Sequence, residues 1–408
     1  MVSCMCKSKN FVLYFWQVNL HASAYRDGSF VDRFFKHDSI KSRVRQIKER
    51  GLFKVRQIGQ SVLGKEIFCI SAGHGKVNIL IWSQMHGDEP TGTMAIFDLL
   101  NFLGSNDLEH VRNTILSQCT VHFIPMLNPD GADFFQRRNA LNIDINRDFL
   151  AMQTPEAKVL LNAQEEIQPA FAFNLHDQNT LWSVTGSRKS AAISLLAPPV
   201  DCNATVTPSR LKAMQLAASV YNLLHTKIPG QVGRWSEEYE PRAVGEVFQS
   251  RGISTVLVEA GGFVDDDEKQ LVRQLNFELL LHSLEQIATG VYSNEKENTY
   301  HRIPLNNKEI FHLLIRNCKV ASPAGYIKAD IGLNYTEELD AAGKNRTKMF
   351  SVADFGDLST WGAYESIDVR NAVLKGTLKI DAVASFNIED DKGIVLSFVK
   401  GIKRIQAI

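Results

Sequence analysis

Four side chains in this sequence have the types and positions needed for metal-assisted hydrolysis. His86 and Glu89 are three positions apart, so both side chains can reach one ion, and His176 can supply a third ligand. Two histidines and one glutamate, with a fourth position left for water, are the ligand pattern of a catalytic zinc ion. Such an ion lowers the pKa of its bound water to about 7, and Glu259 can then accept the proton. The sequence therefore predicts one Zn²⁺ with a further carboxylate beside it.

These residues follow apolar segments that read as buried strands, and the strands must bring them together. The predicted strands cover residues 77–82, 121–124, 171–175 and 255–258, and each runs into a group of polar residues. Open α/β sheets bind ligands outside the carboxyl ends of their strands, so the four groups should meet at one edge. Taken singly, a His-x-x-Glu pair or a histidine at a strand end is more often structural, so the prediction depends on this convergence.

Helices alternate with these strands, and a hairpin over residues 52–73 precedes them. The predicted helices cover residues 90–103, 155–167, 209–226 and 267–288, and Thr154 is the expected N-cap of the second. Continuous apolar strands that alternate with helices indicate an α/β fold. We expect a mixed, mostly parallel sheet with helices on both faces.

From about residue 300 the pattern changes to short strands. We expect an N-terminal extension (1–24), an α/β domain (25–299) and a small β-rich C-terminal domain (300–408), with strands at 310–315, 325–333, 377–382 and 393–399. The β-rich domain either recruits a partner or a glycan, or packs over a sheet edge and protects it. We favour the second role, because its aromatic residues beyond Trp361 and Tyr364 form no platform.

Composition excludes several classes of protein. Lys plus Arg and Asp plus Glu each total 45, and this balance argues against general nucleic-acid binding, which needs a basic excess. A run of 18 apolar residues is missing from the sequence, so no membrane-spanning helix is expected.

The apolar stretch 11–20 precedes Ala22-Ser23-Ala24 but is interrupted by polar residues. We expect a cytoplasmic location, with export through this weak signal-like segment as the alternative.

Together these segments resemble the zinc carboxypeptidase family, the funnel-shaped metallocarboxypeptidases, and in order and spacing its compact bacterial members. The matching segments are His86-Gly87-Asp88-Glu89, Asn128-Pro129-Asp130-Gly131, Arg137-Arg138-Asn139-Ala140, Ile143-Asp144-Ile145-Asn146-Arg147-Asp148-Phe149, Asn174-Leu175-His176 and Glu259. The resemblance covers about residues 45–290. It implies the family's fold and a single zinc ion held by His86, Glu89 and His176.

The resemblance also implies roles for residues around the metal. Glu259 matches the general base, and Arg137 matches the arginine that stabilises the oxyanion, although the adjacent Arg138 could take that place. Asn146 and Arg147 match the pair that grips the terminal carboxylate of the substrate. A planar guanidinium suits that task, because it can bind a carboxylate through two parallel hydrogen bonds.

Four further residues belong to the predicted site, and two of them, Arg242 and Asp177, have two possible roles. Asp144 would orient the metal ligand His86, and Tyr239 would be the mobile tyrosine over the substrate. Arg242 stands where the specificity pocket would form, so it either favours an acidic substrate side chain or pairs with Glu238 or Glu240; we favour the ion pair. Asp177 lines the pocket or caps a turn.

The predicted function is a zinc-dependent metallocarboxypeptidase-like hydrolase that cuts an amide bond next to a free terminal carboxylate. Its substrate would be a peptide. One alternative is a deacylase of N-acyl amino acids or a cell-wall peptide amidase on the same fold. An alternative of another class is a non-catalytic binding protein, which would require loss of a ligand or of the base. The sequence makes no prediction about the oligomeric state.

Overall fold

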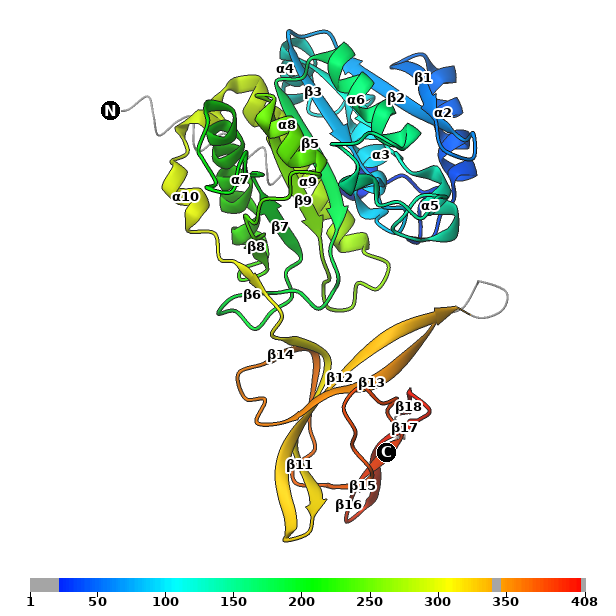
Figure 1. The fold of residues 1–408 in the computed structure, drawn as a ribbon, viewed down its shortest axis with the longest axis vertical. Coiled ribbons are helices and arrows are strands. Elements are labelled where there is room, and N and C mark those ends of the chain that lie inside the picture. The colour runs from blue at the N-terminus through cyan, green and yellow to red at the C-terminus, as the bar shows by residue number, and fades with distance from the viewer. Residues whose placement is uncertain (1–21, 340–345, 405–408) are drawn as a thin grey trace. The chain divides into compact units, whose positions relative to one another are not determined.

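The computed structural model describes residues 22–339 and 346–404, and the chain divides into two compact units (Figure 1). The α/β unit contains the described residues up to Asn179 together with Ala191–Asn306. The β unit contains Thr180–Ser190 and the described residues from Asn307 onward. The division at residue 300 stays a prediction, and nothing in the sequence pattern indicated that Thr180–Ser190 joins the later unit. The signal-like stretch 11–20 lies outside the described residues.

The α/β unit is built on an eight-stranded mixed sheet with the order β1-β2-β4-β3-β5-β9-β7-β8. Its strands are β1 Lys54–Gln60, β2 Glu66–Gly73, β3 Val77–Trp82, β4 Cys119–Ile124, β5 Phe171–Asp177, β7 Ile193–Leu196, β8 Val232–Arg234 and β9 Ser254–Ala260. The central pairs β4–β3, β3–β5 and β5–β9 are parallel, as is β7–β8, whereas β1–β2, β2–β4 and β7–β9 are antiparallel. The predicted mixed, mostly parallel sheet is confirmed.

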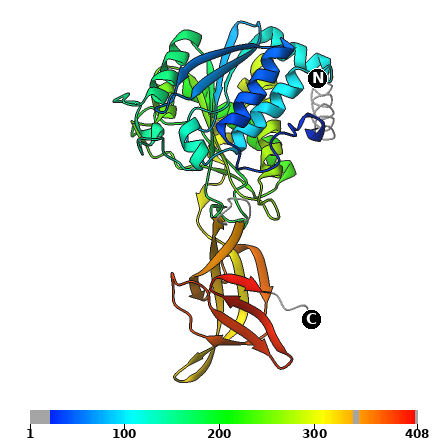
Figure 2. The same ribbon diagram turned by 90° about the vertical axis from the view of Figure 1, so that its right-hand side faces the viewer.

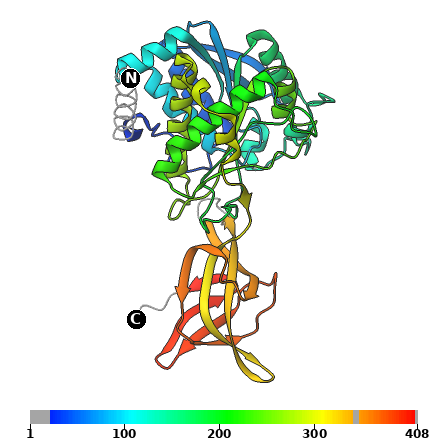
Figure 3. The ribbon, with the colours of Figure 1, turned by 90° about the vertical axis from the view of Figure 1, so that its left-hand side faces the viewer.

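Helices cover both faces of this sheet, as the views from opposite sides show (Figures 2 and 3). The α-helices are α2 His37–Arg50, α3 Thr91–Leu103, α4 Glu109–Gln118, α5 Pro129–Phe134, α6 Pro155–Ile167, α7 Pro208–Lys227, α8 Val244–Ser250, α9 Gln270–Thr289 and α10 Glu297–His301; the 3-10 helices are η1 Ala22–Tyr25, η2 Ile145–Arg147 and η3 Val291–Asn294. As predicted, Thr154 caps α6, where its side chain accepts a hydrogen bond from the Ala157 amide. Within the described part of the chain, no helix is long and apolar enough to cross a membrane.

Strand β5 shows how the sheet separates its two faces. Phe171, Phe173 and Leu175 belong to the hydrophobic cluster shared with α3, α7 and α9. Ala172 belongs to the second cluster, shared with α6 and α8. Because side chains alternate along a strand, His176 lies on the α6–α8 face. The end of β5 therefore presents a metal ligand on that side of the sheet.

The β unit has its own sheet and its own hydrophobic core. Its strands are β6 Ser183–Val184, β11 Ile310–Ser322, β12 Gly325–Leu339, β13 Arg346–Gly356, β14 Gly362–Asp368, β15 Val373–Gly376, β16 Phe386–Asp390, β17 Gly393–Val399 and β18 Ile402–Arg404. Strand β10 Asn306–Asn307 lies where the chain passes from one unit to the other. The sheet has the order β13-β12-β11-β15-β16-β17-β18, with β14 also paired to β11.

One predicted strand of the β unit is wrong. Residues 377–382 form the loop between β15 and β16, although their apolar residues alternate as in a strand. The left-handed backbone of Gly376 (φ 135°) ends β15, and Ala382 donates to the Lys379 carbonyl in a turn that contains Asp381 at φ 62°. Ile380 is 49% exposed, so the apolar alternation does not mark a buried face here. The other three predicted strands lie within β11, β12 and β17.

Candidate metal centre and active site

Three buried side chains from distant parts of the chain meet at the carboxyl edge of the central strands. His86 and Glu89 lie between β3 and α3, and His176 lies near the end of β5. His86 Nδ1 is 2.8 Å from Glu89 Oε1 and 3.1 Å from His176 Nδ1, which is itself 2.7 Å from Glu89 Oε2. One ligand atom from each residue lies within 4.8 Å of the others. The structure thus brings together the three ligands that the sequence predicts.

The chemistry of this donor set fits one zinc ion. His86 Nε2 contacts Asp144 Oδ1 at 3.0 Å; in the neutral imidazole with its proton on that nitrogen, the Nδ1 lone pair is directed at Glu89 and His176. When the facing nitrogens carry no proton, they and the carboxylate oxygen this close together repel one another, and a bound proton or metal ion between them relieves the repulsion. Two nitrogens and one oxygen are also the donors of many catalytic zinc sites.

Electrostatics in the same place favour a positive charge. Burial alone would lower the pKa of His86, but the carboxylates of Glu89 and Asp144 raise it to about 9. Burial alone would raise the pKa of Glu89, but His86 and His176 hold it well below its usual range. Burial lowers the pKa of His176, and Glu89 offsets part of this effect. The site therefore stabilises a cation.

The turn that carries His86 depends on a close approach between two backbone segments. A Cβ atom on Gly87 would lie 2.0 Å from the Gly131 carbonyl carbon, so no larger residue fits without movement. Asn128 ties the two segments together: its Oδ1 accepts from the Gly131 amide at 2.9 Å, and its Nδ2 donates to the Met85 carbonyl at 3.3 Å. The Asn-Pro-Asp-Gly motif thus shapes the ligand turn.

Arg137 lies against the metal ligands, whereas Arg138 does not. Arg137 Nε donates to Asp144 Oδ2 at 3.1 Å, and its Nη1 lies 3.3 Å from Glu89 Oε1. Burial would raise the pKa of Asp144, but His86 and Arg137 hold it well below its usual range. Arg138 is exposed and donates to the Asn142 carbonyl. Of the two arginines, only Arg137 contacts the predicted metal ligands within the described part of the chain.

Glu259 lies beside the third ligand. In the parallel register of β5 and β9, Glu259 is the partner of His176, and neighbouring residues of paired strands point to the same face. Burial, followed by the charges of Glu89 and Asp177, raises the pKa of Glu259 well above its usual value. A metal dication in this cluster would lower that pKa again, because it favours the carboxylate form.

Asn146 and Arg147 lie together in η2. Asn146 Oδ1 accepts from the Val244 amide at 3.0 Å, and its Nδ2 has no partner among the residues that the structure describes. Arg147 Nη1 donates to the Asn146 carbonyl at 2.8 Å, and Arg147 Nε lies 3.3 Å from Glu240 Oε2. The two residues predicted to grip a terminal carboxylate are therefore neighbours, but Arg147 already has an acidic partner.

The loop before α8 carries Tyr239 and Arg242. Arg242 pairs with Glu240 through two hydrogen bonds, Nε to Oε1 at 2.8 Å and Nη2 to Oε2 at 2.7 Å. The structure thus contains the favoured ion pair, formed with Glu240 and not with Glu238. Tyr239 is half-buried, and no hydrogen bond joins its hydroxyl to the described residues. Among the described residues, no hydrogen bond or ion pair joins Tyr239 to the predicted metal ligands.

Asp177 belongs to a buried network behind Glu89. Its amide donates to Glu89 Oε2 at 3.2 Å, and its Oδ2 accepts from Thr91 Oγ1 at 2.6 Å and from Lys269 Nζ at 3.0 Å. Burial raises the pKa of Asp177, and Lys269 opposes this effect. Asp177 therefore helps to hold the predicted ligand Glu89 in place. Sequence reasoning missed its partner Lys269, because the two residues are far apart in the chain and come together only when it folds.

Asn139 is a second residue whose part in the site sequence reasoning missed. It is fully buried, and its Oδ1 accepts from the amides of Leu141 and Ile143 at 3.1 and 3.0 Å. Its Nδ2 donates to Glu156 Oε2 at 3.2 Å. These bonds fix the loop that carries Arg137 at one end and Asp144 at the other.

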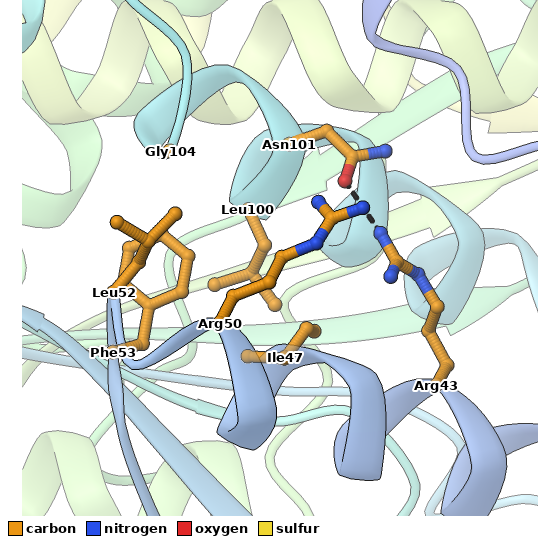
Figure 4. A pocket seen from close by; sticks show the side chains of 8 residues that line it. All are labelled: Arg43, Ile47, Arg50, Leu52, Phe53, Leu100, Asn101 and Gly104. Atoms are coloured by element: carbon orange, nitrogen blue, oxygen red, sulfur yellow. Dashed lines mark hydrogen bonds between the residues drawn. The ribbon is translucent and has the colours of Figure 1, made fainter.

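A pocket of the α/β unit lies at the ends of α2 and α3 and is lined by none of the site residues (Figure 4). Its polar side chains are Arg43, Arg50 and Asn101. Arg43 is already engaged, because its guanidinium bonds to Asp27 and, at 2.6 Å, to Asn101 Oδ1. Arg50 lies in the last turn of α2, where a cation offsets the partial negative charge of the helix end. Arg43 and Arg50 thus have structural roles, and no bound ligand is needed to explain their presence in the pocket.

Comparison with known proteins relates this chain to carboxypeptidases. Residues 41–228 match the family model of zinc carboxypeptidases. Carboxypeptidase SOL1 of Arabidopsis thaliana is 26% identical over 162 residues, which cover 35% of this chain and 33% of that protein. Carboxypeptidase 2 of Trichophyton rubrum is 28% identical over 102 residues, which cover 25% of this chain and 19% of that protein. The chain therefore spans a third or less of the length of these relatives.

Solved structures agree in fold. A metallo-carboxypeptidase from Burkholderia cenocepacia superposes with a TM-score of 0.52 at 15% identity, over 63% of this chain and 70% of that one. Bovine thrombin-activatable fibrinolysis inhibitor superposes with a TM-score of 0.51 at 13% identity, over 66% of this chain and 99% of that one. At these identities the likeness supports the fold alone.

The mixed α/β sheet and the His-Glu-His cluster at its carboxyl edge agree with the class of zinc metallopeptidases. The family match is more specific: residues 41–228 match the model of zinc carboxypeptidases, and this agrees with the resemblance noted in the sequence. The match includes His86, Glu89 and His176 and ends before Glu259.

Proposed function

We propose that this chain is a zinc-dependent hydrolase of the carboxypeptidase type, which cuts an amide bond next to a free terminal carboxylate. The observation that carries the proposal is the meeting of His86, Glu89 and His176, with Glu259 as the strand partner of His176. Metal ligands and a separate carboxyl beside them are the two components that hydrolysis by an activated water requires.

In this proposal each residue has one task. His86, Glu89 and His176 would hold the zinc ion, which when bound supplies a Lewis acid for the scissile carbonyl and for the attacking water. Glu259 would take the proton from that water and deliver it to the leaving amine. Arg137 would donate to the oxygen on which negative charge develops, and this interaction is strongest in the transition state.

Substrate orientation would come from η2. Asn146 Nδ2 is an amide donor without a described partner, and Arg147 offers a guanidinium whose Nη2 has no described partner either. Together they would bind the terminal carboxylate and fix the amide bond next to it over the metal. N-acyl amino acids and cell-wall peptides also end in a carboxylate beside an amide, so the same residues would serve a deacylase or an amidase.

The decisive experiment compares the chain with the variant Glu259→Gln on a mixture of peptides and N-acyl amino acids, with zinc and then with a chelator. We expect single-residue trimming from the carboxyl end that needs zinc, is lost in Glu259→Gln and leaves the zinc content of the variant unchanged. The control is Glu285→Gln, because Glu285 is a second glutamate with a pKa that burial raises, to about 7, and it lies in α9. Unchanged turnover in Glu259→Gln would exclude Glu259 as the base.

The products decide between the alternatives. Free amino acids released from peptides support the carboxypeptidase, and release from N-acyl amino acids alone indicates the deacylase. Zinc binding without any product would support the non-catalytic binding protein.

A further inference from the structure

The carboxylate of Glu240 contacts the arginine that the proposed function assigns to the substrate. We propose that Glu240 is a specificity-determining residue: it competes with the terminal carboxylate of the substrate for Arg147 and keeps Arg242 from binding an acidic side chain. The preferred terminal residue would then have a neutral side chain rather than an acidic one. This inference rests on the proposed function, because it concerns the same substrate site.

Glu240 lies between two guanidinium groups. Its Oε2 is 3.3 Å from Arg147 Nε and 2.7 Å from Arg242 Nη2, and its Oε1 is 2.8 Å from Arg242 Nε. Both oxygens are therefore engaged, and the bond to Arg242 has the two-point geometry that a bound carboxylate would need. The side chain of Arg147 is 36% exposed and that of Arg242 is 55% exposed, so solvent and ligands reach both.

The backbone fixes Glu240 in this position. The Arg242 amide donates to Glu240 Oε1 at 3.2 Å, and the Ala243 amide donates to the Glu240 carbonyl at 2.9 Å. The loop is tied to the neighbourhood of η2 by bonds from the Phe149 amide to the Arg242 carbonyl and from the Val244 amide to Asn146 Oδ1. These hydrogen bonds hold the loop in place and keep Glu240 next to Arg147 in the folded chain.

The positive charges of Arg147 and Arg242 can balance one carboxylate in addition to Glu240. Hydrogen bonds from Arg242, with the nearby charge of Arg147, lower the pKa of Glu240 to about 2, so it is ionised near neutral pH. The neighbouring Glu246 is buried, which raises its pKa to about 7 and keeps it partly protonated there. A terminal carboxylate on Arg147 would balance the two arginines, with Glu240 retained on Arg242. A second carboxylate, from an acidic side chain, would find no free guanidinium.

The test measures binding in the zinc-loaded Glu259→Gln background, which removes turnover. Three N-acyl dipeptide probes are titrated by calorimetry: one ending in leucine, one ending in glutamate, and the leucine probe with its carboxylate amidated. Glu240→Gln should tighten the leucine probe about two- to fivefold, the range for a partly exposed ion pair. It should tighten the glutamate probe about tenfold, because both arginines are released. Affinity for the amidated probe should not change.

A matched control is Glu238→Gln, which removes the same charge from an exposed residue two positions away that has no ion pair with Arg147 or Arg242 among the described residues. Equal effects of Glu238→Gln and Glu240→Gln would overturn the inference, because the change would then be a general charge effect. Equal tightening of all three probes would overturn it as well. The variant Glu240→Asp, whose shorter side chain keeps the charge, should fall between the parent and Glu240→Gln.

The outcome separates this inference from the proposed function. Arg147→Ala in the same background should remove the preference of the parent for the acid over the amide. If it does so and Glu240→Gln changes nothing, the specificity inference fails while the carboxylate grip of the proposed function stands. If both variants behave as expected but the chain with Glu259 intact releases no product, the proposed function fails and the role of Glu240 stands.

Discussion

At the scale of single residues, Asp144 connects the parts of the site. Its Oδ1 contacts His86 Nε2 and also accepts from the Asn146 amide, and its Oδ2 accepts from Arg137. One carboxylate therefore orients a metal ligand, positions the proposed oxyanion partner and caps the short helix that carries the proposed carboxylate grip. Metal ligands usually depend on such a partner on their second nitrogen.

We predict that Asp144→Asn weakens zinc binding by about 10- to 100-fold, because His86 loses the charged partner that raises its basicity. The measurement is competition for zinc against a chelating dye, with far-UV circular dichroism as a check of folding. Asp38→Asn is the control, since Asp38 is an exposed acid in α2. Equal affinity in the parent and Asp144→Asn would contradict the positioning role.

The sequence supplied the ligand types and their convergence, but not every partner. His86, Glu89 and His176 could be predicted because ligand chemistry restricts residue type and because strand ends meet at one sheet edge. The choice of Arg137 over Arg138 required the structure, since both are arginines in one loop. The meetings of Asp177 with Lys269 and of Glu240 with Arg147 depend on packing between distant segments, and no local pattern marks them.

At the scale of secondary-structure elements, α8 carries a buried acid in its first turn. Glu246 is 7% exposed, and burial raises its pKa from 4.5 to about 7. The folded chain therefore binds more protons at this residue than the unfolded chain between about pH 4.5 and 7. Its contribution to the free energy of unfolding is complete below this range and is lost as the pH rises through the folded pKa.

We predict that Glu246→Gln removes part of this pH dependence. Across the range the parent should lose of the order of 2–3 kcal/mol relative to the variant, at about 1.4 kcal/mol for each unit of pKa shift. Urea unfolding of both proteins at several pH values gives the difference curve, in which the similar contribution of Glu285 cancels. Parallel curves would show that Glu246 is not protonated in the folded chain.

Elements with strong local signals could be predicted, and weak ones could not. Helix α6 has Thr154 as its cap and Pro155 in its first turn, and its predicted and observed ranges agree. Strands β7 and β8 are only four and three residues long, so periodicity had too little length to reveal them. The segment 377–382 misled because its apolar residues alternate as in a strand, although Ile380 is exposed and the backbone forms a turn.

At the scale of the whole molecule, a buried ionic cluster joins the beginning and the end of the α/β unit. Arg273 in α9 is fully buried and bonds Asp98 of α3 through two nitrogens, at 2.7 and 2.6 Å. It also donates to the Asp27 carbonyl, and the Asp27 side chain pairs with Arg43 of α2. These ion pairs and hydrogen bonds therefore connect α2, α3 and α9 with the described N-terminal segment.

We predict that Arg273→Met lowers the free energy of unfolding of the α/β unit by about 3–5 kcal/mol, because Asp98 is left buried without its cation. Urea denaturation followed by circular dichroism measures the loss. The double variant Asp98→Asn/Arg273→Met should recover part of it, and the exposed control Arg45→Met should cost little. A double variant no more stable than the single one would show that packing of the arginine, and not the charge, dominates.

The assignment of Thr180–Ser190 to the β unit has a consequence for how the chain is made. The polypeptide changes unit after Asn179, again after Ser190 and a third time after Asn306. Within the β unit, Thr180 bonds His312 and Tyr364, and Ser183 bonds Asn307. On the ribosome these partners emerge after Thr180–Ser190, so the excursion that starts four residues beyond His176 can form these bonds only once they have been made. The fold of this excursion therefore depends on residues made more than a hundred positions later in the chain.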